Sequence, residues 1–205
     1  VCEDGSLFGE EYTLVACADH VLGSRPGDTV SNLSSTRALQ DVAERHGRTR
    51  HASAVGEVNV VEMMRKVKAP IGGEGNGGVI LGELHHGRDA LVGIALFLTL
   101  LARRGVRTSE LRRSYPDYFI SKNKIELEPG MDVAGLVGAM EEKYRQQPHS
   151  TIDGLRIEFG REWVHLRGSN TEPIVRIYAE SNSPDRADEL AKRIMGEMAG
   201  LTERI

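Results

Sequence analysis

A run of small, hydroxyl-bearing and charged residues, Arg167 to Pro173, separates two stretches that alternate in the manner of β-strands. Arg167 carries a planar guanidinium that suits two oxygens of a phosphate group. Ser169 and Thr171 add hydroxyls, Asn170 adds an amide, and the intervening glycine lets backbone N–H groups come close to an anion. The same residue types are ordinary components of a hairpin connection. The segment is therefore either a simple turn or an anion-binding loop.

The alternation in the two flanking stretches predicts which side chains share a face of each strand. In the first stretch one face carries Trp163, His165 and Arg167, and the other carries Val164 and Leu166. In the second stretch one face carries Ile174, Arg176 and Tyr178, and the other carries Val175, Ile177 and Ala179.

A second candidate is the glycine cluster GGEGNGG at residues 72–78, which contains a literal GxGxxG. A dinucleotide site would need a strand before this motif, a helix beginning within it and an acidic residue about 20 positions later. Here the strand-like stretch VIL follows instead, and position 98 is leucine. What remains is a glycine loop that carries the carboxylate of Glu74 and the amide of Asn76. It is either a plain loop or a site for hydrogen bonds to sugar hydroxyls.

Other polar residues do not form a catalytic or metal-binding pattern. His85 and His86 are adjacent, so on a strand they would point to opposite faces, and no nearby spacing completes a set of metal ligands. The pair Glu10 and Glu11 is better explained as negative charge in the first turn of a helix than as an acid/base pair. No local motif indicates a Ser-His-Asp arrangement.

The bulk composition predicts an ordinary globular protein. The chain has 205 residues, 40% apolar and 27% charged, which permits one large domain or two small ones. A net charge of −4 argues against general affinity for nucleic acid or anionic membrane. The two cysteines suggest a reducing cytoplasm, and no stretch reaches the roughly 18 apolar residues of a membrane span. The first residues lack a signal-peptide pattern and an initiator methionine, so we expect a piece of a longer protein.

The order of predicted elements changes along the chain. Helices are expected at residues 10–22, 35–46, 57–67 and 88–105, with strands at 28–35, 49–53 and 79–81. The last of these helices is apolar nearly all round and should be buried between layers, with Asp89 as its N-cap and Gly105 as its end. The polar stretch 107–118 then breaks the pattern.

Beyond that stretch the predicted order is that of a small antiparallel sheet. Strands are expected at residues 119–127, 155–159, 163–167 and 174–180, and helices at 132–146 and 185–198, the latter with Pro184 at its start. We therefore predict an α/β fold followed by an α+β fold. Residues 1–112 would form a mixed-sheet α/β domain, and residues 113–205 a small antiparallel-sheet domain with two helices on one face.

Taken together and in order, these segments resemble the α-D-phosphohexomutases, the family of phosphoglucomutase, phosphomannomutase and phosphoglucosamine mutase. RGSNTEPIVRIYAE at 167–180 is similar to the family's C-terminal phosphate-binding loop, and GGEGNGG stands in the place of its sugar-recognition loop. GEEYTL, NLSSTR, VGEVNV and GRDALVG fit the flanking domain. The resemblance covers essentially the whole chain. It implies that both loops are functional and that the two domains correspond to the third and fourth of four.

The resemblance also implies roles for individual residues. The phosphate site would consist of Arg167, Ser169, Asn170, Thr171 and, on the next strand, Arg176. Glu74, with Asn76 beside it, would accept hydrogen bonds from sugar hydroxyls. Asn76 stands where many members have serine, and Gly78 where many have histidine, so an acid/base role at position 78 is not carried over.

The family's phosphoserine and its Asp-x-Asp-x-Asp magnesium loop have no counterpart in this sequence. No catalytic residue and no metal ligand is therefore assigned to this chain. We interpret it as the C-terminal half of a phosphohexomutase, which interconverts hexose 1-phosphate and hexose 6-phosphate with Mg²⁺ and a hexose 1,6-bisphosphate. Its expected partners are a hexose phosphate and the N-terminal domains 1 and 2 of the same enzyme. The alternatives are a non-catalytic sugar-phosphate-binding module and a structural two-domain protein with ordinary hairpins.

Overall fold

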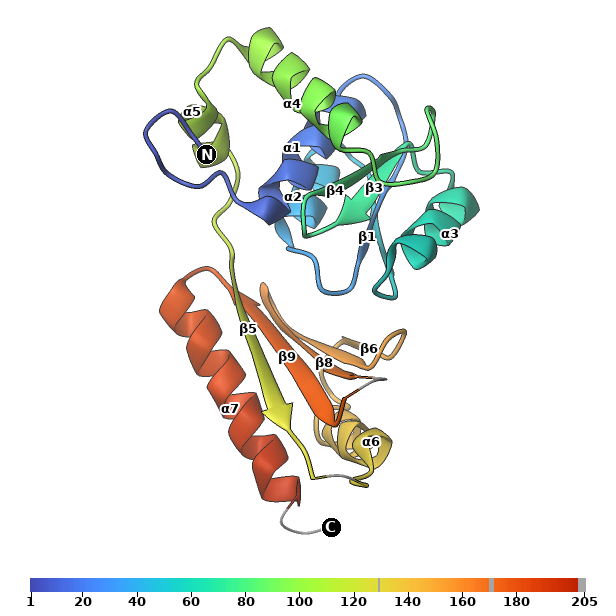
Figure 1. Cartoon of the computed structure of the whole chain (residues 1–205), viewed down its shortest axis with the longest axis vertical. Helices are drawn as coiled ribbons and strands as arrows, with labels where there is room; N and C mark the ends of the chain where they lie inside the picture. Colours follow the sequence, from blue (N-terminus) through green and yellow to red (C-terminus); the bar gives the residue numbers. More distant parts are fainter. Residues whose placement is uncertain (129, 170–171, 203–205) are drawn as a thin grey trace. The chain divides into compact units, whose positions relative to one another are not determined.

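The chain folds into two compact units, each with its own sheet and helices (Figure 1). The computed structural model describes residues 1–128, 130–169 and 172–202. Unit 1 comprises Val1–Asp117 and unit 2 comprises Tyr118–Ile205. None of the described helices is long and apolar enough to cross a bilayer.

Unit 1 contains a four-stranded mixed sheet. Its strands are β1 (Thr29–Asn32), β2 (Arg50–Ser53), β3 (Ile71–Glu74) and β4 (Gly78–Leu81). Its helices are α1 (Glu10–Leu22), α2 (Ala38–Arg45), α3 (Glu57–Val67), α4 (Ala90–Arg104) and α5 (Thr108–Arg113). In the order β2-β1-β3-β4, β1 is parallel to β2 and β3, and β4 is antiparallel to β3. This arrangement confirms the predicted α/β fold.

The glycine cluster is not one loop, as the sequence had suggested, because it supplies parts of two strands. Strand β3 ends at Glu74 and β4 begins at Gly78, so only residues 75–77 form the hairpin turn. At Gly72 a Cβ atom would lie 2.7 Å from the sulfur of Met64 in α3 and 2.9 Å from the carbonyl oxygen of Val30. The glycine therefore lets α3 pack closely on the sheet.

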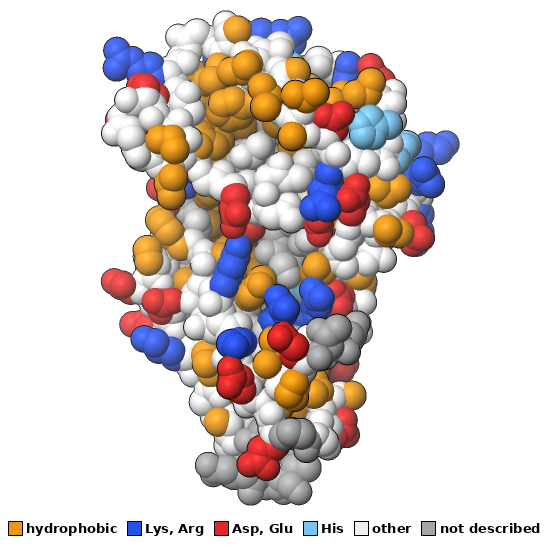
Figure 2. Space-filling model, viewed as in Figure 1, with side chains coloured by type: hydrophobic (Ala, Val, Ile, Leu, Met, Phe, Trp, Pro, Cys, Tyr) orange, Lys and Arg blue, Asp and Glu red, His pale blue; other side chains and the backbone are white. Residues whose placement is uncertain are grey.

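Helix α4 has the predicted ends but not the predicted burial. The Asp89 carboxylate accepts a hydrogen bond from the Val92 amide at 3.0 Å, and Gly105 ends the helix in the left-handed region with φ 62°. The side chains of Leu91, Ile94 and Leu98, however, are 77%, 55% and 56% exposed. Only one face of the helix packs on α1 and β4. Figure 2 shows hydrophobic side chains gathered over the part of unit 1 where α4 lies in Figure 1.

Substitutions on the exposed face of α4 should be tolerated. We expect Leu91→Gln and Leu98→Gln each to change the free energy of unfolding by less than about 0.5 kcal/mol, because neither side chain is packed in the core. Both should reduce binding of an apolar dye, since they remove exposed apolar surface. Chemical denaturation and dye fluorescence measure the two effects. Leu100→Ala is the matched control, because the buried Leu100 should lose far more stability. Equal losses at positions 98 and 100 would contradict the exposed assignment.

A buried carboxylate joins the helices on one side of unit 1. Asp19 of α1 has a side chain only 2% exposed. Its Oδ1 lies 2.9 Å from Arg45 Nη2 and 2.8 Å from His46 Nε2. Its Oδ2 accepts a hydrogen bond from the Tyr115 hydroxyl at 2.9 Å. Arg104 of α4 forms a further ion pair with Asp19. Four donors from three separate parts of the chain therefore converge on one anion.

Unit 2 contains an antiparallel sheet covered on one face by two helices. Its strands are β5 (Phe119–Glu126), β6 (His149–Ser150), β7 (Leu155–Phe159), β8 (Glu162–Gly168) and β9 (Ile174–Ser181), in the order β5-β9-β8-β7-β6. Its helices are α6 (Val133–Lys143) and α7 (Pro184–Thr202). Leu136 of α6 and Ile194 of α7 share one core with the strand residues Val164 and Val175. The predicted α+β unit with two helices on one face is confirmed (Figure 1).

Some element boundaries differ from those predicted. Helix α2 begins at Ala38 rather than Ser35, because the Ser35 hydroxyl donates to the Asn32 side chain in a local turn and the Thr36 amide donates to Glu11 of α1. The short helix α5 and the two-residue strand β6 were not predicted at all.

Candidate functional site

Arg167 and Gly168 are the last residues of β8, and the chain then connects β8 to the antiparallel strand β9 as a hairpin. The last paired residues before the turn are Gly168 and Val175. The Ser169 amide donates a hydrogen bond to the Ile174 carbonyl oxygen at 3.0 Å, which closes the hairpin. Asn170 and Thr171 lie outside the described residues. The turn interpretation is therefore correct for the backbone, and the anion-binding interpretation depends on the side chains around it.

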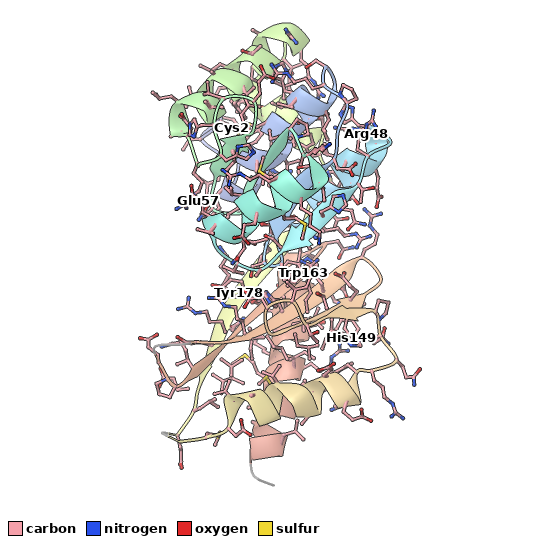
Figure 3. All side chains as sticks on the ribbon, turned by 90° about the vertical axis from the view of Figure 1, so that its right-hand side faces the viewer. Cys2, Arg48, Glu57, His149, Trp163 and Tyr178 are labelled. Carbon is pink, nitrogen blue, oxygen red and sulfur yellow. The ribbon has the colours of Figure 1, made fainter. Side chains whose placement is uncertain are left out.

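Three cationic residues stand side by side on adjacent strands of unit 2. In the register of the sheet, Arg176 of β9 lies directly between Lys124 of β5 and Arg167 of β8. We call these three residues the cation row. Because side chains alternate along a strand, the row lies on the opposite face from core residues such as Val175 and Ile177. Tyr178 and Trp163 stand at alternate positions from Arg176 and Arg167 on the same strands, so they share the face of the cation row, which is the side of the sheet away from α6 (Figure 3).

Lys124 of the cation row pairs with Glu126 at 2.9 Å, but the two arginines of the row are poorly neutralised by the protein. Arg176 is exposed and has no ion-pair partner among the described residues. Arg167 Nε lies 3.7 Å from Asp153 Oδ1, at the long end of an ion pair. Like charges directly opposite each other destabilise a sheet. An anionic ligand would relieve this repulsion, and two arginines can donate several hydrogen bonds to a phosphate.

A neutral histidine lies next to the row. His165 is paired in register with Tyr178 and with Arg156. Burial, together with the charges of Arg156 and Arg167, lowers the pKa of His165 to about 4, although a hydrogen bond to the Asp153 carbonyl acts in the opposite direction. At neutral pH the ring is uncharged, and its Nε2–H donates to that carbonyl oxygen at 2.6 Å. His165 therefore positions the Asp153 segment beside Arg167 and adds no charge.

Gly168 has a packing role at the end of β8. A Cβ atom at this position would lie 2.8 Å from Cγ1 of Val133, in the first turn of α6. The absence of a side chain thus lets the hairpin end pack against the helix.

In unit 1, Glu74 lies at the carboxyl end of β3, beside the carboxyl end of the parallel strand β1. Glu74 as a whole is only 7% exposed to solvent. Oε1 accepts hydrogen bonds from Asn32 Nδ2 at 2.9 Å and from the Gly56 amide at 3.1 Å. Oε2 lies 3.5 Å from Arg88 Nη1. Glu74 is thus a fixed carboxylate at the strand edge where open α/β sheets bind ligands.

Arg88 connects this carboxylate to a second one. Its Nε donates to Glu57 Oε2 and its amide to Glu57 Oε1, both at 2.8 Å. These two hydrogen bonds and the Arg88 charge hold the pKa of Glu57 below its usual range. Arg88 keeps a side chain 44% exposed, so it can still donate to a ligand. A carboxylate has about four acceptor positions, which leaves Glu74 capacity for hydroxyl groups as well.

Asn76 serves the turn. It is exposed, and its Oδ1 accepts a hydrogen bond from the Gly78 amide at 3.1 Å. The neighbouring Gly75 amide donates to Ser35 Oγ at 3.1 Å. These contacts order the β3–β4 hairpin, so Asn76 has a local structural role whatever it does toward a ligand.

The described residues do not fit the magnesium ion that the sequence resemblance implies. Among them no group of three or more His, Cys, Asp or Glu side chains could hold a metal. His85 Nε2 pairs with Asp89 Oδ2 at 3.0 Å.

Comparison with known proteins places both units in one family. The family model "Phosphoglucomutase/phosphomannomutase, alpha/beta/alpha domain III" matches residues 9–118, and the model for the C-terminal domain of the same family matches residues 123–197. The chain belongs to the phosphoglucomutase/phosphomannomutase family. This confirms the resemblance to the C-terminal half of the α-D-phosphohexomutases.

Curated members of the phosphoglucomutase/phosphomannomutase family extend well beyond this chain. It is 33% identical over 190 residues to a phosphoglucomutase/phosphomannomutase of Thermococcus kodakarensis, covering 91% of this chain and 41% of the relative. It is 31% identical over 193 residues to a probable phosphoglucosamine mutase of Methanopyrus kandleri, covering 93% of this chain and 42% of the relative. The chain thus spans less than half the length of these relatives.

Solved structures of the family share the fold. A phosphoglucomutase/phosphomannomutase family protein of Burkholderia thailandensis superposes with a TM-score of 0.76 at 24% identity, covering 96% of this chain and 43% of the other. A putative phosphomannomutase of Thermus thermophilus gives a TM-score of 0.71 at 24% identity, with 93% and 41% covered. Both alignments run through unit 1 and unit 2.

Proposed function

We propose that this chain is the hexose-phosphate-binding part of a phosphohexomutase. Unit 2 would bind the phosphate group and unit 1 the sugar hydroxyls. The observation that carries the proposal is the pair Arg167 and Arg176, which face each other across β8 and β9 beside the β8–β9 turn. Two facing guanidinium groups, with one carboxylate 3.7 Å from Arg167, suit a phosphate dianion. Ser169, Asn170 and Thr171 belong to the same proposed site.

The role proposed for unit 1 is recognition of the sugar. Glu74 is held by Asn32, Gly56 and Arg88, so it can accept hydrogen bonds from hydroxyl groups without moving. A preorganised acceptor discriminates between epimers, because a hydroxyl on the wrong side of the ring cannot donate to it. Asn76 is proposed as a second, weaker contact.

The proposed reaction of the whole enzyme is the interconversion of hexose 1-phosphate and hexose 6-phosphate. Solved structures of an Aspergillus fumigatus N-acetylphosphoglucosamine mutase carry glucose 1,6-bisphosphate in one case and GlcNAc-6P with magnesium in another. We propose a bisphosphate intermediate and Mg²⁺ for the complete enzyme, the ion stabilising charge during phosphoryl transfer. The residues of this chain would position the substrate, and one phosphate clamp could grip either end of the turned intermediate.

Two further proposals concern partners and location. The family model numbers the first unit as domain III, and the curated relatives are more than twice as long as the chain. We propose that N-terminal domains of the same enzyme are its partners, and that the exposed face of α4 is available to them. Cys2 and Cys17 are free and buried, in keeping with a proposed cytoplasmic location.

The proposal is tested by calorimetry on the 205-residue chain. Glucose 6-phosphate and mannose 6-phosphate should bind, while glucose and mannose without phosphate should bind far more weakly or not at all. The difference follows because the charge-assisted contacts of unit 2 need the phosphate. Equal heats for phosphorylated and unphosphorylated sugars would refute the phosphate-binding role.

Glu74→Gln tests the sugar site separately. The change keeps the shape of the side chain but places an amide among donors, so we expect the Kd for the preferred hexose phosphate to rise about tenfold. Discrimination between glucose and mannose phosphates should fall with it. Binding of inorganic phosphate should stay unchanged, because unit 2 is intact. Asn76→Ala is the control, with an expected change of about twofold or less in Kd, since Asn76 mainly serves the turn. Unchanged discrimination in Glu74→Gln would leave Glu74 a purely structural residue.

A further inference from the structure

Gly78, at the start of β4, leaves a space that the side chain of Arg88 fills. A Cβ atom at position 78 would lie 2.5 Å from Cδ of Arg88 and 3.2 Å from its Cγ. The shorter distance is well below the roughly 3.5 Å at which two carbon atoms pack. The backbone itself does not call for glycine, because Gly78 is a strand residue without a positive φ. Gly78 therefore serves to admit Arg88, and a larger residue at this position would displace that side chain.

The rest of the glycine cluster admits side chains in the same way. Met64 of α3 packs against Gly72, and at Gly75 a Cβ atom would overlap the carboxylate of Glu11 from α1. Side chains from three separate parts of the chain, Arg88 included, are thus inserted at three glycines. They hold the β3–β4 hairpin in place, and with it the carboxylate at the end of β3.

Hydrogen bonds fix the direction of the Arg88 side chain and leave its outer edge available. The Nε and amide groups each donate to Glu57 at 2.8 Å and so contact both of its carboxylate oxygens. Nη1 lies 3.5 Å from Glu74 Oε2, beyond the usual length of an N–H···O hydrogen bond. A guanidinium has five N–H groups, and this side chain is 44% exposed. Arg88 therefore has donors to offer a ligand beside Glu74.

Arg88 and Glu74 place a donor and an acceptor side by side. The guanidinium can only donate hydrogen bonds, and the carboxylate can only accept them. Their separation of 3.5 Å is small enough for two adjacent hydroxyl groups of a hexose ring to reach both. One hydroxyl can then donate to Glu74 while its neighbour accepts from Arg88.

We propose that Arg88 is a specificity-determining residue of the sugar site, which takes the space left by Gly78 and, with Glu74, binds two adjacent hydroxyl groups of the hexose. The inference rests on the proposed function, and no bond is made or broken in it. A donor and an acceptor fixed side by side select the orientation of both hydroxyls, whereas Glu74 alone would select one. The ligand class is thus a hexose phosphate with two neighbouring free hydroxyls.

Calorimetry on the 205-residue chain tests the two contacts with glucose 6-phosphate and its 2-deoxy, 3-deoxy and 4-deoxy analogues. In the wild type, loss of either of two adjacent hydroxyls should raise Kd about fivefold to tenfold. Arg88→Gln should raise the Kd for glucose 6-phosphate about fivefold and abolish the sensitivity to one of these hydroxyls, and Glu74→Gln should abolish the sensitivity to the other. The Kd for inorganic phosphate should stay within about twofold, because unit 2 is intact. Arg65→Gln, which removes an exposed cation of α3, is the control and should change none of these values.

Gly78→Ala tests the space that Arg88 occupies. The methyl group should displace Arg88 and raise the Kd for glucose 6-phosphate about threefold or more. In the double variant Gly78→Ala, Arg88→Gln the two losses should not multiply, because both remove the same contact. Asn76→Ala is the matched control for the turn, since Asn76 Oδ1 would lie 3.1 Å from the new Cβ atom.

Three outcomes would overturn the role of Arg88: an unchanged Kd in Arg88→Gln, a wild type that is sensitive to the loss of only one hydroxyl, and losses that multiply in the double variant. Each of them leaves binding of glucose 6-phosphate by the wild type intact and so refutes the Arg88 contact alone. If the wild type binds neither glucose 6-phosphate nor inorganic phosphate, the proposed function falls and the inference falls with it. Circular dichroism and chemical denaturation check that the Arg88→Gln variant folds, and Gly78→Ala alone decides the test if it does not.

Discussion

Arg167→Ala is expected to weaken binding of glucose 6-phosphate by about 1.5 to 3 kcal/mol, or roughly tenfold to 150-fold in Kd. The range is that of a hydrogen bond to a charged group. Arg167 fits it because its side chain is only 34% exposed and its one carboxylate neighbour, Asp153, lies at 3.7 Å. Calorimetric titration of the wild type and the variant under the same salt conditions measures the effect, which should shrink as ionic strength rises.

Replacement of Arg176 should also weaken the binding of glucose 6-phosphate. Arg176→Ala takes away the central member of the cation row, and the loss should be similar to that of Arg167→Ala. The two losses should not add, since both side chains act on one phosphate. Arg145→Ala is the matched control in unit 2, because this arginine is 64% exposed and pairs with Glu142 on the surface. Equal affinity in the wild type and in both row variants would eliminate the phosphate clamp.

The same two variants should also affect the stability of the ligand-free protein. Like charges at directly opposite positions of a sheet repel, so neutralising one should leave the ligand-free sheet no less stable, or slightly more stable. A site residue that stabilises the ligand complex but not the empty fold is expected at a functional position.

The sequence predicted best the elements whose caps and periodicity lie within a short stretch. Helices α1 and α3 have the predicted bounds, Glu10–Leu22 and Glu57–Val67. Helix α4 shows what periodicity cannot reveal. Its residues are apolar on all sides, which indicates contact on all sides, yet only the face with Gly93 and Leu100 is covered in unit 1. Local sequence reports that a face is apolar, but it does not report which other segment covers it.

The sequence indicated single candidate residues, but it did not indicate which distant residues lie beside them. Arg167 and Glu74 were found because their residue types stand in glycine- and hydroxyl-rich stretches. Asn32, which is 42 positions before Glu74, joins it only because β1 and β3 are parallel neighbours. Lys124 joins the cation row only through the register of β5 with β9. Such pairs depend on long-range strand pairing, which a single sequence does not specify.

Asp19→Asn is expected to have the largest effect on stability in unit 1, about 3 kcal/mol of unfolding free energy. Removing one partner of a buried ion pair costs roughly 3 to 5 kcal/mol, since the remaining charge is left unpaired. The low end applies here because Arg45 and Arg104 keep side chains 45% and 36% exposed and can turn toward water. Hydrogen exchange of α1 and α4 measures the loss, while Trp163 fluorescence reports on unit 2 as an internal reference.

The contribution of Asp19 to the free energy of unfolding should decrease at acidic pH. Burial alone would raise the pKa of Asp19, but hydrogen bonds from His46 and Tyr115 and the charges of Arg45 and Arg104 lower it below the ordinary value of 3.8. A carboxyl group whose pKa is lower in the folded state stabilises the fold fully above its unfolded pKa. That contribution is lost as pH falls through the lower, folded pKa. The stability difference between the wild type and Asp19→Asn should therefore be constant near neutral pH and shrink below about pH 4.

Two controls separate this buried charge from ordinary polar contacts. Tyr115→Phe removes one neutral donor to Asp19 and should cost only about 0.5 to 1.5 kcal/mol, with little change in the pH profile. Asp117→Asn removes a carboxylate that is 67% exposed and paired with Arg112, and should cost less than about 1 kcal/mol. If Asp19→Asn costs no more than Asp117→Asn, the four donors do not depend on the charge of Asp19. In that case the contacts between α1 and the Arg45, Arg104 and Tyr115 side chains are held by packing alone.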